Sequence, residues 1–355
     1  MKLTFLSPLY ARQGPFACAY LDTSSESGDP ERAIGLRLRQ VRQDLLAQGV
    51  DPATRGAVTH LVGADRDVPG RHGQAIFAAR GKLALFEELP AVPPRDTTRF
   101  TMLPDAMPLA LQHAPDIPYL AVAVREDEPA VDIQAGRWPT TRVAAGEWVH
   151  RPLPRGERRP AAARIAGELA ELAAESGAEA VVLAGDRSAR ELIHHQLPPT
   201  VSDLVVGLEG PGRSAEPGRA LLEDELDQLF HGRLAAADRA RLERFLAQRA
   251  FGPGPAEGLA AVVDALRAGR AEALLVNDPM DLSRKLWVGL TPRQLALSAD
   301  ELQAGGVKSC WPEPADAALI RAVVATGADL VVVPREELPL TDGLGVLLRP
   351  PGAPG

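Results

Sequence analysis

Cysteine is almost absent from this chain. Only Cys18 and Cys310 occur among 355 residues, and neither has another cysteine or a histidine near it in the sequence. This excludes a zinc ribbon, a CxxC redox centre and a disulfide framework. We interpret both residues as small apolar side chains in partly buried positions, and we expect no metal site.

Long apolar runs and recognisable catalytic motifs are missing as well. No stretch reaches the roughly 18 uninterrupted apolar residues that a membrane span needs, and the opening segment is too short and too polar for a signal peptide. The glycine-rich segment 252–258 fits neither G-x-G-x-x-G nor Walker A, and neither G-x-S-x-G nor S-x-x-K occurs. We therefore expect a cytosolic protein with no membrane contact, no cofactor and no standard catalytic centre.

Positive charge is not in excess. The chain has 39 Lys and Arg against 47 Asp and Glu, a net charge of −8. Neutralising phosphates requires Lys and Arg, so we expect no DNA binding. Any RNA contact must come from a local basic patch on an acidic protein.

Three segments share one pattern: a helix, a closing glycine, an alanine and an acidic residue, and then a short apolar run. Their glycines are Gly177, Gly269 and Gly327. Glycine closes a helix in the left-handed conformation, and a continuous apolar run is typical of a strand covered on both faces. Repeated helix-to-strand units predict an α/β fold, and the length suits two or three domains.

The N-terminal part, to about residue 115, has its own signals. Residues 16–21 read as a strand, and residues 29–48 read as an amphipathic helix that Gly49 closes. Arg80-Gly81 between two apolar runs predicts a hairpin. The proline-rich stretch 90–118 has little periodicity and predicts a linker, while residues 221–248 predict a long helix.

Two arginine-rich segments are candidate RNA contacts. Residues 137–159 predict a loop with six arginines, two tryptophans and a histidine, which suits phosphate contacts and base stacking. The helix at 29–48 carries further arginines. The candidates are Arg137, Arg142, Trp148, His150, Arg151, Arg155, Arg158 and Arg159 in the loop, and Arg37, Arg39 and Arg42 in the helix. The alternative is an ordinary solvated loop and a solvated helix face.

A third polar segment follows the apolar run 180–185. Ser188-x-x-Glu191 predicts a capping box at the start of a helix, which accounts for these residues without any chemistry. Asp186 lies at the carboxyl end of a predicted strand, where a general acid or base remains an open alternative.

Residues 15–23, 118–206 and 251–349, taken in this order, resemble bacterial homologues of the class 1 release factors of eukaryotes and archaea, the family that includes Pelota- and Balon-like factors. The resemblance implies three domains: an N-terminal α/β domain at 1–115, a middle domain of RNase H-like topology at 116–218, and an L7Ae-like C-terminal α/β domain at 219–355. Release factors of this kind cleave peptidyl-tRNA with a Gly-Gly-Gln loop. No Gly-Gly and no Gln lies between Gly136 and Pro160, so we infer that peptide release is absent.

The resulting hypothesis is a non-catalytic factor that binds the ribosomal A site in hibernation or stress. Its arginine-rich loop would meet rRNA, and its C-terminal domain would meet elongation factor Tu or another translational GTPase. Two alternatives stay open. One is a peptidyl-tRNA hydrolase with a non-standard loop, in which Gln134 or His150 orients the water. The other is a diverged stress protein with a protein partner and no ribosome.

Overall fold

The computed structural model describes residues 1–24, 30–65, 71–125, 130–139, 149–207, 226, 229–230, 232–251, 256–280 and 282–350. The chain forms two compact units. One combines Met1–His113 with Ala237–Gly355, and the other is Ala114–Ala236. The expected α/β fold of several domains is confirmed. The expected boundaries at 115/116 and 218/219 stay a prediction, and the second lies outside the described residues.

The N-terminal sheet is antiparallel, in the order β3-β2-β1-β4. Its strands are β1 Phe16–Asp22, β2 Gly73–Ala79, β3 Lys82–Leu89 and β4 Thr97–Thr101. Between β2 and β3, Arg80 and Gly81 have φ of 50° and 78°. Positive φ at both turn residues is what a tight two-residue hairpin requires. The predicted strand and hairpin are both confirmed.

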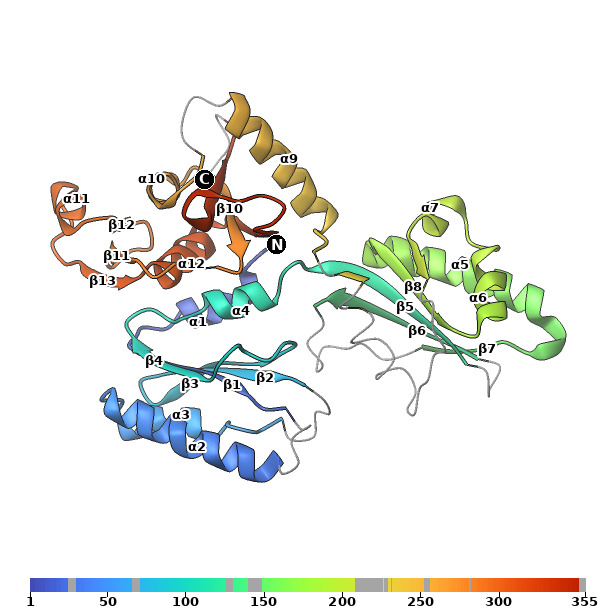
Figure 1. Ribbon diagram of the computed structural model, residues 1–355, viewed down its shortest axis with the longest axis horizontal. Helices are drawn as coiled ribbons and strands as arrows, with labels where there is room; N and C mark the ends of the chain where they lie inside the picture. The colour runs from blue at the N-terminus through green and yellow to red at the C-terminus, as the bar shows by residue number, and fades with distance from the viewer. Residues whose placement is uncertain are drawn as a thin grey trace. The chain divides into compact units, whose positions relative to one another are not determined.

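Two helices, α2 Pro30–Ala47 and α3 Pro52–Thr59, cover one face of this sheet (Figure 1). The predicted amphipathic helix is confirmed, because Ile34, Val41 and Leu45 of α2 are buried in the core. Short helices α1 Ser7–Tyr10 and α4 Met107–Gln112 lie toward the other face (Figure 1). The predicted linker over 90–118 is therefore wrong. It contains β4, a half-buried edge strand whose threonines and arginine give no apolar alternation, and α4.

The unit at 114–236 holds a mixed five-stranded sheet in the order β7-β6-β5-β8-β9. Strands β5, β8 and β9 are parallel, whereas β6 and β7 are antiparallel to their neighbours. The strands are β5 Ile117–Arg125, β6 Ala130–Trp138, β7 Val149–Pro152, β8 Ala180–Gly185 and β9 Val205–Gly207. Helices α5 Arg158–Ser176 and α6 Arg187–His194 bury Ile165 and Ile193 against one face. Phe230 and Leu226 pack with Tyr119 on the other face.

The C-terminal part has a three-stranded sheet in the order β14-β10-β15 and a smaller one in the order β12-β11-β13. The elements are α9 Ala236–Phe251, α10 Leu259–Arg267, β10 Ala271–Asp278, β11 Lys285–Val288, β12 Leu295–Ala296, α11 Ala299–Ala304, β13 Trp311–Pro314, α12 Ala315–Thr326, β14 Asp329–Pro334 and β15 Leu344–Leu348. The predicted helix over 221–248 is wrong as one element. Gly232 has a φ of 69°, and the helix that follows begins only at Ala236.

The three glycines that close helices behave as the sequence predicts. Gly177 and Gly327 are left-handed C-caps of α5 and α12, with φ of 64° and 62°. Gly269 follows α10 with a φ of 69°. The strands after them are β8, β10 and β14, so this turn chemistry sets the α/β layering of both units.

Candidate functional site

The described residues of the predicted loop over 137–159 lie mostly in regular structure. Arg137 and Trp138 end β6, residues 149–152 form β7, and α5 begins at Arg158. The prediction of a single loop is therefore wrong, because β7 is only four residues long and its sequence, Val-His-Arg-Pro, has no apolar alternation that would mark a strand. Arg142 and Trp148 lie outside the described residues.

The strand register separates the predicted arginines into two groups. Arg137 pairs with Pro118 near the start of β5, whereas Arg151 pairs with Val131 near the start of β6. At about 3.3 Å per residue, the six residues from Val131 to Arg137 span roughly 20 Å. The structure therefore does not bring all predicted residues into one patch.

Residues at the Arg137 end support the fold. The Arg137 guanidinium donates to the Asp116 carboxylate, and this hydrogen bond raises the pKa of Arg137. Trp138 stacks on Phe230 with ring centroids 5.9 Å apart. Both side chains thus have structural partners within the same unit.

At the opposite end, two of the predicted residues pair with acids. The Arg151 Nε donates to both oxygens of the Glu168 carboxylate at 2.9 and 2.8 Å. His150 Nδ1 lies 2.7 Å from Asp132 Oδ1 on the neighbouring strand. The side chain of Asp132 is 7% exposed, and that of His150 is 55% exposed. The buried Asp132 carboxylate thus orients the His150 ring through Nδ1, and the other ring nitrogen, Nε2, is directed away from Asp132.

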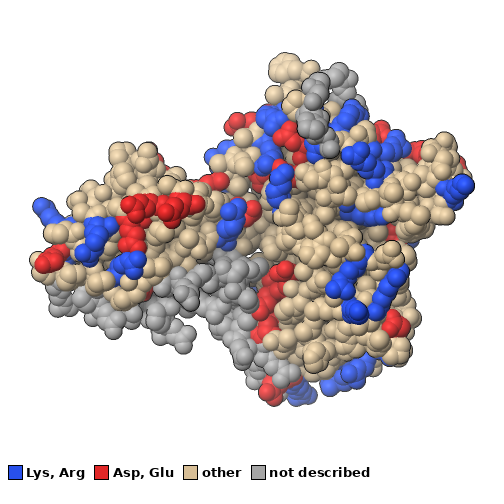
Figure 2. Space-filling model, turned by 180° about the vertical axis from the view of Figure 1, so that it is seen from behind, with Lys and Arg blue, Asp and Glu red and all other residues tan. Residues whose placement is uncertain are grey.

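Beside them, Arg158 and Arg159 are exposed in the first turn of α5. The turn before it, η3 Arg155–Glu157, starts at Arg155, whose side chain lies outside the described residues. Glu157 makes no side-chain capping bond, and the first turn of α5 has no acid. Cations are disfavoured at a helix N-terminus, and Arg158 has a charge interaction with the Asp186 carboxylate. The two exposed guanidinium groups suit an anionic ligand. Figure 2 shows Lys and Arg side chains, with Asp and Glu side chains among them, over the end of the unit where α5 begins.

Helix α6 starts nearby, and its cap differs from the predicted one. Asp186 is the N-cap, with Oδ1 accepting from the Ala189 amide and from Ser188 Oγ, each at 2.7 Å. The predicted Ser188 capping box is therefore wrong, and Glu191 instead pairs with Arg187. Hydrogen bonds from Ser188 and Ala189 lower the pKa of Asp186. This carboxylate is held ionised as a cap, which argues against its use as a general acid.

The three candidate arginines of α2 also fall into two groups, one paired with acids and one exposed. Arg37 turns toward the sheet, where it pairs with Asp22 and Asp96 at 2.9 and 3.0 Å. Arg39 and Arg42 are exposed and make no ion pair with any residue that the structure describes. Only these two are therefore available on the surface as the sequence predicts.

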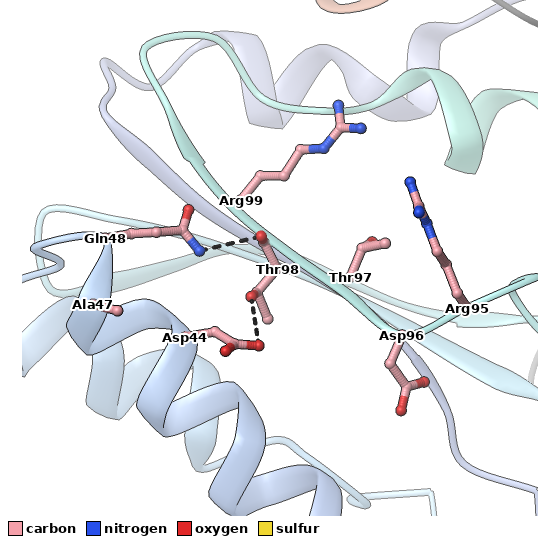
Figure 3. Close-up of a pocket in the computed structure, with 8 residues that line it drawn as sticks. All are labelled: Asp44, Ala47, Gln48, Arg95, Asp96, Thr97, Thr98 and Arg99. Atoms are coloured by element: carbon pink, nitrogen blue, oxygen red, sulfur yellow. Dashed lines mark hydrogen bonds between the residues drawn. The ribbon is translucent and has the colours of Figure 1, made fainter.

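A shallow pocket of about 510 Å³ lies between the C-terminal half of α2 and the start of β4 (Figure 3). The Gln48 amide donates to the Thr98 carbonyl at 3.2 Å, and Thr98 Oγ1 donates to Asp44 Oδ2 at 3.4 Å. Figure 3 shows Arg95 and Arg99 on the other side of β4, away from Asp44. The sequence does not predict this pocket. Its two sides, α2 and β4, come together because β4 pairs with β1, and no local sequence pattern shows that pairing.

A buried polar cluster connects the N-terminal sheet with α12 inside the larger unit. Burial raises the pKa of Asp105 to about 6, with Arg99 opposing the shift and Asp316 adding to it. Arg99 lies 3.3 Å from Asp105 and 4.0 Å from Asp316. The Tyr20 hydroxyl donates to the Asp105 carbonyl at 2.6 Å. No sequence motif marks this cluster, because its members lie far apart in the chain.

Within the described part of the chain, no three His, Cys, Asp or Glu side chains are placed to hold a metal ion. None of the helices described there is long and apolar enough to cross a bilayer.

In the comparison with known proteins, a family model matches the middle part of the chain. Residues 116–251 match the sequence model of bacterial archaeo-eukaryotic release factor family 2. The whole chain is 28% identical over 372 residues to Uncharacterized protein Rv2629 of Mycobacterium tuberculosis (strain ATCC 25618 / H37Rv), covering 98% of this chain and 97% of the relative. The same values hold for Uncharacterized protein MT2704 of strain CDC 1551 / Oshkosh.

Solved structures of Pelota-type proteins are similar over most of the chain. Archaeoglobus fulgidus Pelota has 17% identity and a TM-score of 0.38, over 78% of this chain and 79% of that one. S. cerevisiae Dom34, a translation termination-like factor interacting with Hbs1, has 13% identity and a TM-score of 0.35, over 79% and 80%. TM-scores of this size carry no functional argument.

The mixed sheet with α5 and α6 lies within the residues that match this release-factor family model. The sequence from residue 116 to residue 251, which contains this sheet, is similar to bacterial archaeo-eukaryotic release factor family 2. This similarity over the middle of the chain agrees with the resemblance to archaeal and eukaryotic release factors that the sequence led us to expect.

Proposed function

We propose that this protein is a ribosome-associated factor that binds the A site without releasing the peptide, in hibernation or stress. The family match of residues 116–251 supports a role in translation. The absence of Gly-Gly-Gln between Gly136 and Pro160 supports binding without peptide release. The C-terminal domain would meet elongation factor Tu or another translational GTPase.

The observation that carries the RNA contact is the start of α5. Arg158 and Arg159 are exposed there, at the positive end of a helix of 19 residues. An rRNA or tRNA phosphate at this position would pair with both guanidinium groups at the positive end of the helix dipole. Arg151 would join only after leaving Glu168.

The test is equilibrium binding of labelled protein to 70S ribosomes across a salt series. We expect the triple variant R155A/R158A/R159A to weaken binding and to flatten the salt dependence. Removing two to three phosphate contacts lowers the log–log slope by roughly 1.5 to 2.5. The matched control is Arg187→Ala, since Arg187 is an exposed arginine of α6 that pairs with Glu191. Wild-type affinity and slope in the triple variant would refute this contact surface.

A second candidate function rests on His150 and Asp132. A carboxylate that holds one imidazole nitrogen leaves the other to accept a proton from water, the base–orienter arrangement of many hydrolases. The geometry supports an esterase that uses His150 in place of the missing Gln of the release-factor loop.

This candidate is tested by release of labelled peptide from peptidyl-tRNA–ribosome complexes at high protein concentration. Release that His150→Gln abolishes and Asp132→Asn reduces would establish the hydrolase. No release by the wild-type protein excludes it and leaves the non-catalytic factor.

A further inference from the structure

Helix α2 presents an outward face on which two leucines flank an arginine and a glutamine. Leu36, Arg39, Gln43 and Leu46 follow the spacing 3, 4, 3 that keeps residues on one side of a helix. The side chains of Leu36 and Leu46 are 53% and 59% exposed, the opposite of what an amphipathic helix needs for its own fold. The inward face already buries Ile34, Val41 and Leu45, so these two leucines are not needed for the core.

The same face is basic although the protein is acidic overall. From Arg32 to Gln43 the helix contains four arginines and no acid. One of them, Arg37, turns inward to Asp22 and Asp96. Arg39 and Arg42 remain exposed beside the leucines. The surface therefore combines apolar and cationic groups and is complementary to a partner that is apolar and acidic.

The chemistry of this face distinguishes a protein partner from RNA. RNA recognition uses arginines together with aromatic side chains that stack on bases. No aromatic residue occurs anywhere in α2. Two half-exposed leucines gain nothing from a phosphate backbone, but they fit the apolar side of another helix.

The neighbouring pocket extends the same surface. Ala47, next to Leu46, forms part of its lining, together with Asp44, Gln48 and residues 95–99 (Figure 3). Two arginines, Arg95 and Arg99, and two acids, Asp44 and Asp96, are among these residues. A helix lying along α2 would therefore find a recess of about 510 Å³ at the C-terminal end of the leucine stripe. Figure 1 shows α2 on the outer side of its sheet, with no described element drawn over its outward face.

We propose that the outward face of α2 is a docking site for an acidic amphipathic helix of a protein partner. Leu36 and Leu46 are ten residues apart in the sequence, about 15 Å along the helix axis. They would contact apolar residues spaced over two to three turns of the partner. Arg39 and Arg42 would pair with Glu or Asp residues on either side of that apolar stripe. This site is independent of the arginines at the start of α5.

A synthetic helical peptide with leucines at i, i+3, i+7 and i+10 and flanking glutamates is the direct probe. Its affinity for the full-length protein is measured by fluorescence anisotropy. We expect saturable binding that L36D/L46D weakens at least tenfold. R39Q/R42Q should weaken it severalfold and remove most of its salt dependence. A peptide with serines in place of the leucines should not bind.

The matched control is Leu83→Asp, because Leu83 of β3 is also an exposed leucine, at 39%, outside this face. It should bind the peptide like the wild type. Circular dichroism of each variant confirms that α2 still folds. Absence of peptide binding, or wild-type affinity in L36D/L46D, overturns the proposal.

A single-stranded RNA oligonucleotide, tested in parallel, separates the two classes of partner. RNA binding that depends on Arg39 and Arg42 but is unaffected by L36D/L46D would assign the face to RNA and overturn the proposal. Because neither assay contains ribosomes, the result stands whether or not the protein binds the A site.

Discussion

Replacing Asp105 by asparagine should stabilise the protein at neutral pH. Asp105 is buried, and burial raises the pKa of its carboxyl from 3.8 to about 6. Above this pH the folded protein must keep a carboxylate in an apolar setting near the second acid Asp316, which Arg99 compensates only in part. Asparagine resembles the protonated form in shape and carries no charge.

The sign and the size of this change in the free energy of unfolding follow from the linkage between proton binding and folding. Between about pH 3.8 and 6 the folded state keeps a proton that the unfolded chain has released, so the free energy of unfolding falls as the pH rises through this window. A shift of about 2 pKa units corresponds to about 3 kcal/mol. We therefore expect Asp105→Asn to be more stable than the wild type by about 2–3 kcal/mol at pH 7.5 and nearly equal to it near pH 4.

The assay is hydrogen exchange at several pH values, with mass spectrometry of peptides from β1 and β4 after correction for intrinsic exchange. The contacts of the Asp105 backbone with Tyr20 and Cys18 should persist in the variant. Asp203→Asn is the control, since Asp203 is exposed in the other unit. A variant less stable than the wild type at pH 7.5, or a difference independent of pH, would refute the reasoning.

Three further predictions concern the unit at 114–236. Glu168→Gln frees Arg151 from its ion pair, so ribosome affinity should rise severalfold at low salt and match the wild type at high salt; unchanged affinity would exclude Arg151 from the contact. Asp186→Ala removes the cap of α6 and should cost about 1 kcal/mol in urea denaturation at neutral pH. Because the pKa of Asp186 is lowered, the difference should shrink as the pH falls below about 3.8, and a loss that persists in acid would contradict the capping role. Gly185→Ala should cost about 3 kcal/mol or more, since φ is 95° and the added Cβ would meet the Val124 carbonyl oxygen; Gly156→Ala, which meets nothing within 4 Å, is the control that should change little.

The parts of the fold that local chemistry determines could be predicted from the sequence. Gly177, Gly269 and Gly327 mark helix ends because no other residue enters the left-handed region so easily. Arg80-Gly81 marks a hairpin for the same reason. The buried strand 180–185 is visible as a continuous apolar run.

Elements whose stability comes from distant partners were missed. Strand β4 is polar and is recognised only through its pairing with β1. Strand β7 is four residues long and, among the strands that the structure describes, pairs with β6 alone. The cap of α6 was misplaced by two residues because Asp186 and Ser188 are both good capping residues, and only the geometry shows which one accepts from the Ala189 amide.

The residue types of the candidate site could be predicted from the sequence, but the spatial arrangement of their side chains could not. The sequence identifies arginines, yet it does not show that Arg137, Arg151 and Arg37 are held by Asp116, Glu168 and Asp22. Such ion pairs join residues from 15 to 21 positions apart in the chain. What remains exposed, Arg158 and Arg159 on α5 and Arg39 and Arg42 on α2, is a smaller and more specific set.

Sedimentation of the purified protein with 70S ribosomes on sucrose gradients tests the central claim most directly. It is run with and without elongation factor Tu, at low and high salt. We predict co-sedimentation at low salt that fades as salt rises and that R155A/R158A/R159A reduces. Absence of the wild-type protein from the ribosome fractions under every one of these conditions would contradict the account.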